Sequence, residues 1–592
     1  MLNFICLFFP SVILMAFREK IFKNKIFTQP CKRQRIKEYC LSNLFVNFAT
    51  ISVTYLVFNH VGPLESSISQ YTDFAFKYLL LAMMISLIEP VAEYVIRFHL
   101  SVNCKFKKLE IRNYILYFYT LSLFALNFIR IFDNAFWGDE GYTIKLAKMS
   151  IEQMINTTAA DVHPPLYYLF TQLLYHVLGN HGYTYHLSGL IPYAVILIIA
   201  CTTVNKYFGK ISAFVLVTMS SIMKNAVVNN VEVRMYSLAA MFVLAAYIAL
   251  YCIIEKNRVI DWVIFCIMSL GAAYTHYYAL ISVAFFYLML IPVVIKNHNC
   301  IKRLIISYAA TVLAYLPWLG ILLQSFKRTS NSWWSDTIPS FVSCISYIFD
   351  YKWLFVAFII VIIIFIMYQM EIVNFRITNN GFMVDNIDIS INISEKLSFN
   401  GEILWMLSGV ISIFGTMAVG LVLSYAIRPL FLERYLFPVS IMAYLILGFC
   451  ISKMQLRKVW AMLLIILILW SNVPYFVNNY KYENSLNRET SAFLTAVNPS
   501  SSDIIYTDNS HLGWTLLPYY YSNNSGGYKP DAIENLDQDY NEILLLWTQE
   551  LDETSLENVN KQGYDYEKIY EGRFANGAYY YAYKLDKVDN LE

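Results

Sequence analysis

Long apolar stretches separated by short polar loops dominate this sequence. About 20 apolar residues in a helix are enough to cross the hydrocarbon core of a bilayer. About thirteen stretches meet this criterion, near residues 41–60, 75–99, 112–133, 186–204, 211–229, 235–254, 261–277, 279–295, 304–322, 347–370, 403–426, 436–452 and 459–475. Because only 15% of the 592 residues are charged and 58% are hydrophobic, the chain has too little polar surface for a soluble protein. The sequence therefore predicts a polytopic, all-α membrane protein.

The basic residues give these spans an orientation. Lysine and arginine concentrate in the cytoplasmic loops of membrane proteins. The short basic loops CKFKKLEIR, KYFGK, EKNR, KNHNCIKR and SKMQLRK all fall on one side of the predicted spans, as does the N-terminal segment REKIFKNKIFTQPCKRQRIK. We expect this side to face the cytoplasm, in a multi-pass protein of the cell membrane, and the chain after residue 475 to lie outside.

Composition divides the chain into three parts. Residues 1–111 form an N-terminal extension with two extra spans and the basic segment. Residues 112–475 form the membrane core, with a large external loop at 134–185. Residues 476–592 are polar and tyrosine-rich, and we expect them to form a small extracytoplasmic α/β domain. There DIIYTD and EILLLW are typical of buried strands, SLENVNKQGY of a helix and its stop, and NGAYYYAYKLD of a strand entered through an Asn-Gly turn. The stretch 371–402 predicts a longer cytoplasmic loop.

The external loop concentrates charge and proline at the end of an apolar span. Asp139 and Glu140 follow the span almost directly, and Asp161, His163 and the pair Pro164-Pro165 come later in the loop. Carboxylates this close to hydrocarbon usually serve a function, and a proline pair fixes an extended backbone. The pattern favours a catalytic loop over an ordinary solvated connection.

The same orientation brings polar groups from other loops to the outer face. A transporter is expected to carry its polar groups near the bilayer midplane, often within an inverted repeat, and no such repeat is visible. The pattern instead indicates chemistry at the outer rim of the membrane. The groups are Glu232 and Arg234, His276, Trp333 and Trp334, and Arg428 to Arg434.

Five short motifs in this order resemble the GT-C glycosyltransferases that use polyprenyl-phosphate sugars. Within that fold the chain is most similar to the bacterial relatives of protein O-mannosyltransferases and of lipid A aminoarabinose transferases. The resemblance covers roughly residues 112–475, and the two extra spans before it depart from the family pattern. The motifs are Trp137-Gly138-Asp139-Glu140, Asp161-Val162-His163-Pro164-Pro165-Leu166-Tyr167, Glu232-Val233-Arg234-Met235-Tyr236, Thr275-His276-Tyr277-Tyr278 and Glu433-Arg434-Tyr435-Leu436-Phe437-Pro438.

The resemblance implies transfer of a sugar from a polyprenyl-phosphate carrier to an acceptor on the outer face, with inversion at the anomeric carbon. The acceptor could be a protein, a lipid or a cell-wall polymer. Such a reaction needs a carboxylate to take the acceptor's proton and cations to hold the departing phosphate. Two alternatives remain: a transporter or flippase of lipid-linked sugars, and a non-catalytic envelope protein that binds glycan.

The acidic residues of the external loop are the candidate catalytic groups. Asp139 is the candidate base, because the family's acidic pair supplies this role. Glu140 either orients the donor or the base, or is the acid that favourably begins the following helix. Asp161 and His163 either position the acceptor or the base, or in the case of His163 stabilise the proline turn.

Cations and aromatic residues of the other motifs are the candidate donor site. Arg434 and Arg234 are expected to grip the carrier phosphate, because a guanidinium fork suits phosphate oxygens. His276 and Tyr277 either line the donor cavity or, for the tyrosine, belong to an interfacial aromatic belt. No acidic cluster or histidine spacing demands a metal, so no cofactor is expected, with a divalent metal left as an alternative. The balance of 44 basic against 42 acidic residues argues against nucleic acid as a partner.

Overall fold

The computed structural model describes residues 112–588, except for residues 297 and 576 and the stretches 332–336, 371–372, 381–382, 392–399, 455–456 and 501–502. The predictions for the N-terminal extension, including its two spans and basic segment, lie outside the described residues. The same is true of Trp333 and Trp334.

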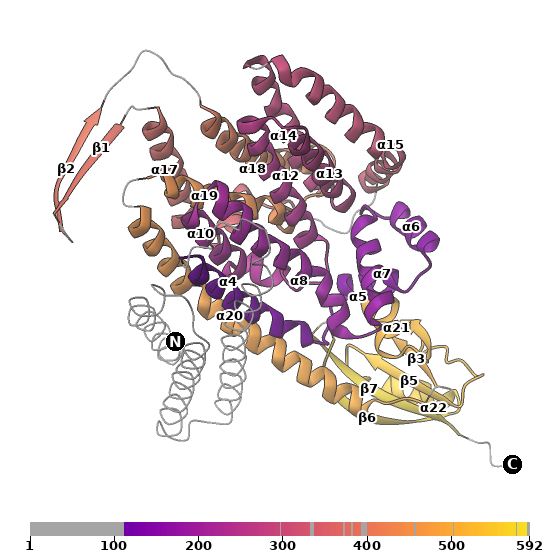
Figure 1. The fold of residues 1–592 in the computed structure, drawn as a ribbon. Coiled ribbons are helices and arrows are strands. Elements are labelled where there is room, and N and C mark those ends of the chain that lie inside the picture. The colour runs from indigo at the N-terminus through magenta and orange to yellow at the C-terminus, as the bar shows by residue number, and fades with distance from the viewer. Residues whose placement is uncertain are drawn as a thin grey trace, which may run out of the picture. The chain divides into compact units, whose positions relative to one another are not determined.

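Nine helices in the described part are long and apolar enough to cross a membrane, as the sequence predicts for a polytopic helical protein. Two shorter apolar helices, α10 (Lys210–Ile222) and α13 (Val259–Thr275), lie among them. Figure 1 shows the bundle that they form. The nine are built from α4 (Arg112–Phe128), α8 (Gly182–Ile199), α12 (Tyr236–Lys256), α14 (Tyr277–Lys296), α15 (Ile301–Asn331), α17 (Lys352–Gln369), α18 (Gly401–Ala426), α19 (Phe437–Lys453) and α20 (Arg457–Ala496).

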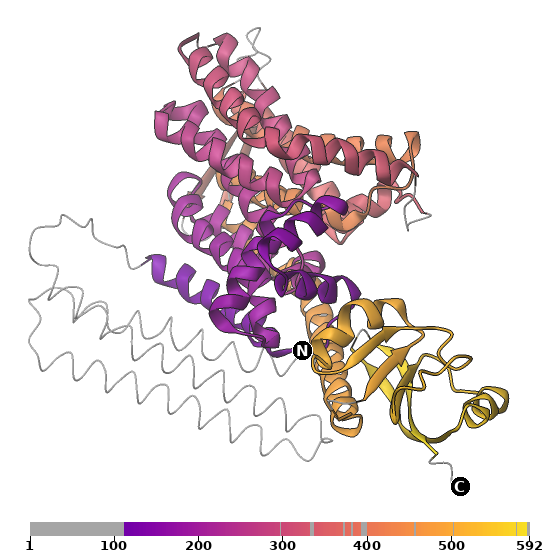
Figure 2. The ribbon, with the colours of Figure 1, turned by 90° about the vertical axis from the view of Figure 1, so that its right-hand side faces the viewer.

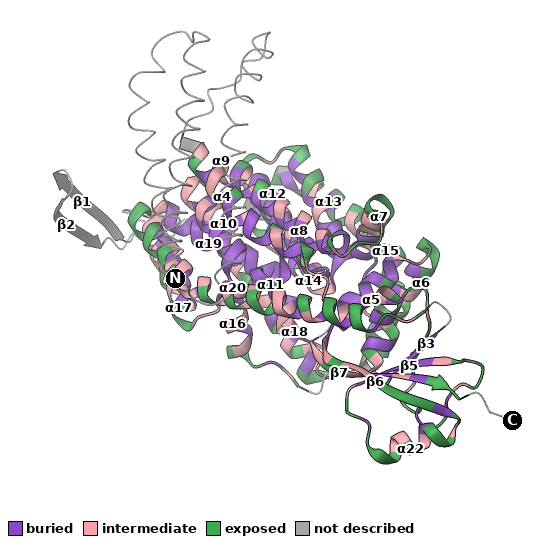
Figure 3. Cartoon of the chain, turned by 90° about the horizontal axis from the view of Figure 1, so that it is seen from below, coloured by how far each residue is buried: buried purple, intermediate pink, exposed green. Residues whose placement is uncertain are grey.

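The bundle has a centre and a periphery. The apolar window of α19 is entirely buried and that of α12 is 78% buried, whereas only 17% of the window of α15 is covered. Figure 3 shows the buried residues gathered on the inner helices. Exposed isoleucine and leucine side chains along α15 and α17 present the kind of surface that lipid tails cover. The helices α12 and α19 therefore form the centre of the bundle, and α15 lies at its edge.

The predicted span at 211–229 is interrupted. The backbone leaves the helix at Met223 (φ −59°, ψ 145°), which ends α10 and begins a short helix, α11 (Lys224–Asn229). The carboxylate of Asp350 accepts a hydrogen bond from the Lys224 N–H at 2.8 Å, so an acid from another segment caps the new helix start. Apolar composition alone could not reveal this break.

The external loop folds into three helices. These are α5 (Gly138–Ala147), α6 (Ile151–Ala160) and α7 (Leu166–Leu178). Ser150 caps α6, since its hydroxyl accepts from the Gln153 N–H, and Pro165 stands immediately before α7, where a proline costs no helical hydrogen bond. The acidic pair thus lies in the first turn of a helix.

The C-terminal part contains the predicted α/β domain. Its five-stranded sheet has the order β4-β3-β5-β7-β6, with β3 parallel to both neighbours and β7 antiparallel to both of its own. The predicted strands and helix are confirmed as β3 (Ile504–Thr507), β5 (Glu542–Trp547), β7 (Ala578–Lys587) and α22 (Glu553–Lys561). The strands β4 (Ser525–Tyr528) and β6 (Tyr564–Phe574) were not predicted.

Helix α20 joins the bundle to this domain without a loop. It runs for 40 residues, about 60 Å at 1.5 Å per residue, and so extends well past the predicted span end at residue 475. Figures 1 and 2 show it leading from the bundle to the sheet. Glu483 on this extension forms a two-pronged ion pair with the buried Arg130, at 2.8 and 2.5 Å. The domain is therefore attached through a continuous, anchored helix.

The predicted loop at 371–402 contains a hairpin. Strands β1 (Val373–Asn380) and β2 (Met383–Ile391) pair antiparallel, with Val373 opposite Ile391. Figure 1 shows the hairpin at the end of α17.

Candidate functional site

The candidate base lies against two arginines. Asp139, in the first turn of α5, has Oδ2 3.0 Å from Nη2 of Arg434 and 3.7 Å from Nη2 of Arg234. Its side chain is 28% exposed, so solvent or substrate can reach it. Arg234 also donates from Nη1 to the Asp139 carbonyl oxygen at 3.3 Å. Two segments about 200 residues apart thus place both cations on one carboxylate.

The two arginines differ in access. The Arg234 side chain is 3% exposed, and the Arg434 side chain is 25% exposed. The Arg434 guanidinium lies over the ring of Trp137 at 5.4 Å and over that of Tyr236 at 5.9 Å, positions in which an aromatic face stabilises a cation. Arg434 is therefore the cation that a ligand can meet, while Arg234 supports Asp139 from behind.

Glu140 has the contacts of a structural acid. Its carboxylate accepts hydrogen bonds from the Val233 N–H at 2.9 Å and from the Trp137 N–H at 3.2 Å, and its side chain is buried. Burial, with the nearby charge of Glu232, raises its pKa well above the usual value. These contacts agree with the interpretation of Glu140 as the acid that begins the helix, and they join α5 to the segment that carries Arg234.

Glu232 is a third acid, which the sequence places at the outer face without a role. Burial raises the pKa of its carboxyl, and the positive charges of Arg434 and Arg234 oppose that rise. The sequence signal that could have identified Glu232 as a site residue is its position two residues before Arg234 in the same short segment. Among the described residues of this site, two guanidiniums therefore meet the partly exposed carboxylate of Asp139, with the carboxyl of Glu232 nearby.

Asp161 and His163 form a second group. Nδ1 of His163 lies 3.2 Å from Oδ2 of Asp161, and the rings of His163 and His276 are centred 6.4 Å apart. Burial acts to raise the pKa of the Asp161 carboxyl, but hydrogen bonds from His163 and Tyr142 hold it below the usual value. The lowered pKa keeps Asp161 ionised. The hydroxyl of Tyr142 is a partner of Asp161 that sequence reasoning missed.

His276 lies between the two groups. Its ring is centred 5.6 Å from that of Tyr236 and 5.0 Å from that of Tyr435. Burial, with His163 and the two arginines nearby, lowers its pKa well below the usual value, so the ring is neutral. Among the described residues its buried Nδ1 has no hydrogen-bond partner.

Tyr277 belongs to a different neighbourhood. Its hydroxyl accepts a hydrogen bond from Nε1 of Trp318 on α15 at 3.2 Å, and its ring packs with Ala273 and Tyr315. Within the described part of the chain, no contact joins Tyr277 to Asp139 or to either arginine. Tyr277 therefore lies against α15 and near the charge of Asp161, and not at Asp139.

The C-terminal domain packs against α5 and the residues just before it. The Tyr520 hydroxyl donates to the Asn134 carbonyl at 2.6 Å and accepts from the Phe136 N–H at 3.0 Å. A Cβ on Gly138 would come within 2.7 Å of the His511 ring, and one on Gly141 within 2.7 Å of the Leu516 side chain. Only glycine allows this close approach. Sequence reasoning missed these contacts because they join residues nearly 400 positions apart.

A known protein family matches part of the chain that carries the site. A family model described as "Dolichyl-phosphate-mannose-protein mannosyltransferase" matches residues 162–321. That stretch contains His163, Arg234 and His276, whereas Asp139 and Arg434 flank it. None of the curated proteins matches the chain significantly.

Solved structures similar to this chain include two of ArnT from Cupriavidus metallidurans. The apo form is 12% identical, with a TM-score of 0.48, and the match covers 80% of this chain and 98% of that one. The form bound to undecaprenyl phosphate is also 12% identical, with a TM-score of 0.47 and coverage of 79% and 97%. The arabinosyltransferase EmbB from Mycobacterium smegmatis is 12% identical, with a TM-score of 0.36 and coverage of 63% and 34%.

The bundle of apolar helices and the family match over residues 162–321 agree with the expectation, drawn from the sequence motifs, of a membrane glycosyltransferase of the GT-C type. Over residues 162–321, from the His-Pro-Pro motif into α15, the chain is similar in particular to the dolichyl-phosphate-mannose-protein mannosyltransferases.

Proposed function

We propose that this protein transfers a sugar from a polyprenyl-phosphate carrier to an acceptor hydroxyl on the outer face of the membrane, with inversion. The observation that carries the proposal is the meeting of Arg434 and Arg234 on the single carboxylate of Asp139. Two guanidiniums at one carboxylate can hold an anionic ligand, and the carboxylate beside them suits proton removal.

Arg434 is the proposed phosphate ligand. It is the more exposed of the two arginines, and Trp137 and Tyr236 hold its guanidinium in place. As the bond between the anomeric carbon and the phosphate oxygen breaks, the electron pair goes to that oxygen. The guanidinium stabilises the resulting negative charge on the polyprenyl phosphate.

Asp139 is the proposed base. Its carboxylate takes the proton of the acceptor hydroxyl while the acceptor oxygen forms the new bond on the opposite face of the sugar. Arg234 is nearly buried behind it and donates to its backbone carbonyl, so we assign this arginine to positioning Asp139. The neutral, buried His276 lines the same site.

The proposed location of the reaction is the outer face. The basic loops of the predicted topology place α5, the arginine segments and the C-terminal domain together on that side, and their contacts place them in one neighbourhood. The donor sugar and the acceptor, which is a protein, a lipid or a cell-wall polymer, are left for experiment to identify.

The test is transfer of label by the purified full-length protein. Reconstituted protein is given radiolabelled polyprenyl-phosphate hexoses together with membrane extracts, and the label is followed. We expect label to leave the carrier for an acceptor fraction, and the Asp139→Asn protein to lack this transfer. Movement of labelled carrier across vesicle membranes without transfer would favour a transporter, and binding without either would favour a glycan-binding protein.

A further inference from the structure

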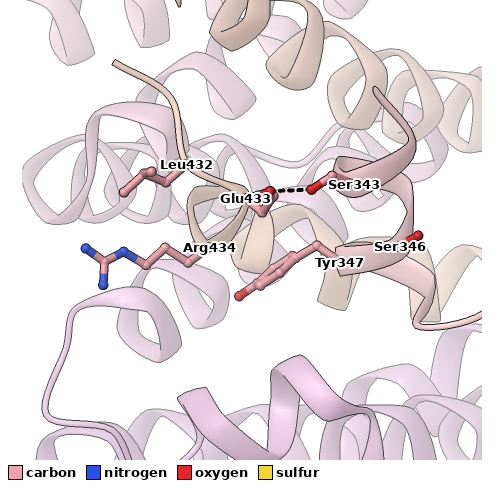
Figure 4. A pocket seen from close by; sticks show the side chains of 6 residues that line it. All are labelled: Ser343, Ser346, Tyr347, Leu432, Glu433 and Arg434. Atoms are coloured by element: carbon pink, nitrogen blue, oxygen red, sulfur yellow. Dashed lines mark hydrogen bonds between the residues drawn. The ribbon is translucent and has the colours of Figure 1, made fainter. Parts of the chain in front are cut away.

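A groove lies beside Arg434. It has a volume of about 560 Å³ and is lined by residues of α16 (Phe341–Phe349) and of the segment that enters α19. This volume falls within the range of small-molecule sites in proteins, roughly 300–1,000 Å³. Figure 4 shows the lining residues, which are Ser343, Ser346, Tyr347, Leu432, Glu433 and Arg434.

The chemistry of the groove is that of a site for hydroxyl groups. Ser343 donates from Oγ to Oε1 of Glu433, and the other carboxylate oxygen, Oε2, has no hydrogen-bond partner among the described residues. An ionised carboxylate accepts strong hydrogen bonds from neighbouring hydroxyls. The hydroxyl of Ser346 and the apolar surfaces of Leu432 and Tyr347 complete a lining that can meet both faces of a sugar ring.

Hydrogen bonds from α11 fix the position of Tyr347 in the wall of the groove. The Tyr347 carbonyl accepts from Nδ2 of Asn225 at 2.9 Å, and its hydroxyl accepts from Nδ2 of Asn229 at 3.1 Å. Tyr444 on the buried helix α19 donates to Oδ1 of the same Asn225 at 2.9 Å. A ligand therefore meets a site whose polar groups are already in position, which lowers the entropy lost on binding.

The order of groups along the groove matches a sugar phosphate. Glu433 and Ser343 meet at one side, while the Arg434 side chain extends away from them (Figure 4) to the carboxylate of Asp139, 3.0 Å distant. A sugar ring in the groove would thus have the phosphate-binding cation and the base at one end.

We propose that the groove binds a pyranose ring, with vicinal hydroxyls hydrogen-bonded to Glu433 and Ser343. The inference rests on the proposed function, because a glycosyl transfer brings two sources of such a ring to this place, the donor's sugar and a sugar of the acceptor. Glu433 is then the residue that selects the sugar, whereas Arg434 holds the phosphate whatever sugar it carries.

The first experiment separates sugar from phosphate. The full-length protein and its Glu433→Gln and Ser343→Ala variants are reconstituted, and binding is measured for undecaprenyl phosphate and for its mannose and glucose esters. A lost hydrogen bond to a charged group lowers affinity about tenfold or more. We expect that loss for the sugar-bearing esters only, with the affinity for undecaprenyl phosphate unchanged. Glu550→Gln, an exposed acid of the C-terminal domain paired with Lys568, is the matched control.

A rise in the KM for acceptor, with unchanged binding of the esters, would equally support the sugar site and assign it to the acceptor. The proposal is overturned if both variants bind the esters and turn over like the unchanged protein, or if they lose undecaprenyl phosphate and its esters alike.

The second experiment does not depend on the proposed function. Ser346→Cys places a thiol in the groove, and its reaction with a maleimide is followed with and without methyl α-mannopyranoside or methyl α-glucopyranoside. We expect the glycosides to slow the reaction. Protection of this thiol in a protein that transfers no label would keep the sugar site and reject the transferase. Absence of protection by either glycoside, together with unchanged ester binding in Glu433→Gln, would reject the site itself.

Discussion

Replacing Asp139 by asparagine removes the proposed proton acceptor while keeping the size of the side chain. The amide cannot take a proton from an acceptor hydroxyl, and loss of a general base costs about a hundred- to ten-thousand-fold in rate. That range corresponds to about 2.7–5.5 kcal/mol of activation free energy. We therefore expect the turnover of Asp139→Asn to fall by this factor.

The structure predicts a different outcome for binding and folding. The variant loses the ion pairs with Arg434 at 3.0 Å and with Arg234 at 3.7 Å, but the hydrogen bond from Arg234 to the backbone carbonyl of residue 139 remains. Because the carboxylate no longer competes for the two guanidiniums, the affinity for the donor phosphate should be equal or higher. The loss of folding stability should stay below the 3–5 kcal/mol that removing a partner from a fully buried pair costs.

The assay compares three variants at the same protein concentration. Turnover, lipid-donor binding and thermal stability are measured for Asp139→Asn, Glu140→Gln and Asp161→Asn. Glu140→Gln should lose thermal stability. Each carboxylate oxygen of Glu140 accepts a hydrogen bond from one backbone N–H, and glutamine replaces one of these oxygens by an NH2 group that cannot accept. If Asp139→Asn turns over normally and Asp161→Asn is inactive, the base lies at the other end of the loop.

Four further predictions follow from other contacts. Arg434→Ala should weaken donor binding more than Arg434→Lys, because lysine keeps the charge but not the fork; equal donor binding by Arg434→Ala and the unchanged protein would remove it from the site. Tyr520→Phe removes the partner of the Asn134 carbonyl and of the Phe136 N–H and should cost about 1–3 kcal/mol of stability together with activity, whereas Tyr528→Phe, on the edge strand, should not; calorimetry and turnover decide. Burial raises the pKa of Asp350 to about 7, from a usual 3.8, so the folded form binds the proton more tightly than the unfolded form. Its contribution to stability falls by about 1.4 kcal/mol per unit as pH rises from about 4 to 7, and Asp350→Asn should show a flatter dependence of melting temperature on pH over that range. A reporter cysteine placed after residue 476 should react with impermeant reagents in intact cells, and its protection would reverse the predicted topology.

The bundle was predictable because its signal is local. A window of about 20 residues contains all that a membrane helix requires, and the helices fall where the apolar stretches do. The break at Met223 was not predictable in this way, since the acid that caps the new helix, Asp350, comes from a segment more than a hundred residues later. The strand β4 was missed because its Ser-Gly-Gly-Tyr sequence is typical of a turn.

The sequence predicted which residues belong to the site better than it predicted how they are arranged. Charge at the ends of apolar spans singled out Asp139, Arg234 and Arg434, and the structure brings these three together. Which arginine is accessible depends on packing, which no single position encodes. Tyr277 was predicted from its neighbour His276, but successive residues at a helix start point in different directions, and its hydroxyl meets Trp318.

The hydroxyl of Tyr520 has a consequence for the order of events during synthesis. Helix α5 and the residues just before it are made more than 360 residues earlier than the side chains that hold them, which come from Tyr520 and the cluster around Leu512 and Leu516. Domains of a growing chain fold in the order in which they emerge, so the membrane bundle can assemble while the residues around Asp139 still lack their support. A nascent or truncated protein would then occupy the membrane with an unfinished site, which would form only once residues 512–520 had been made.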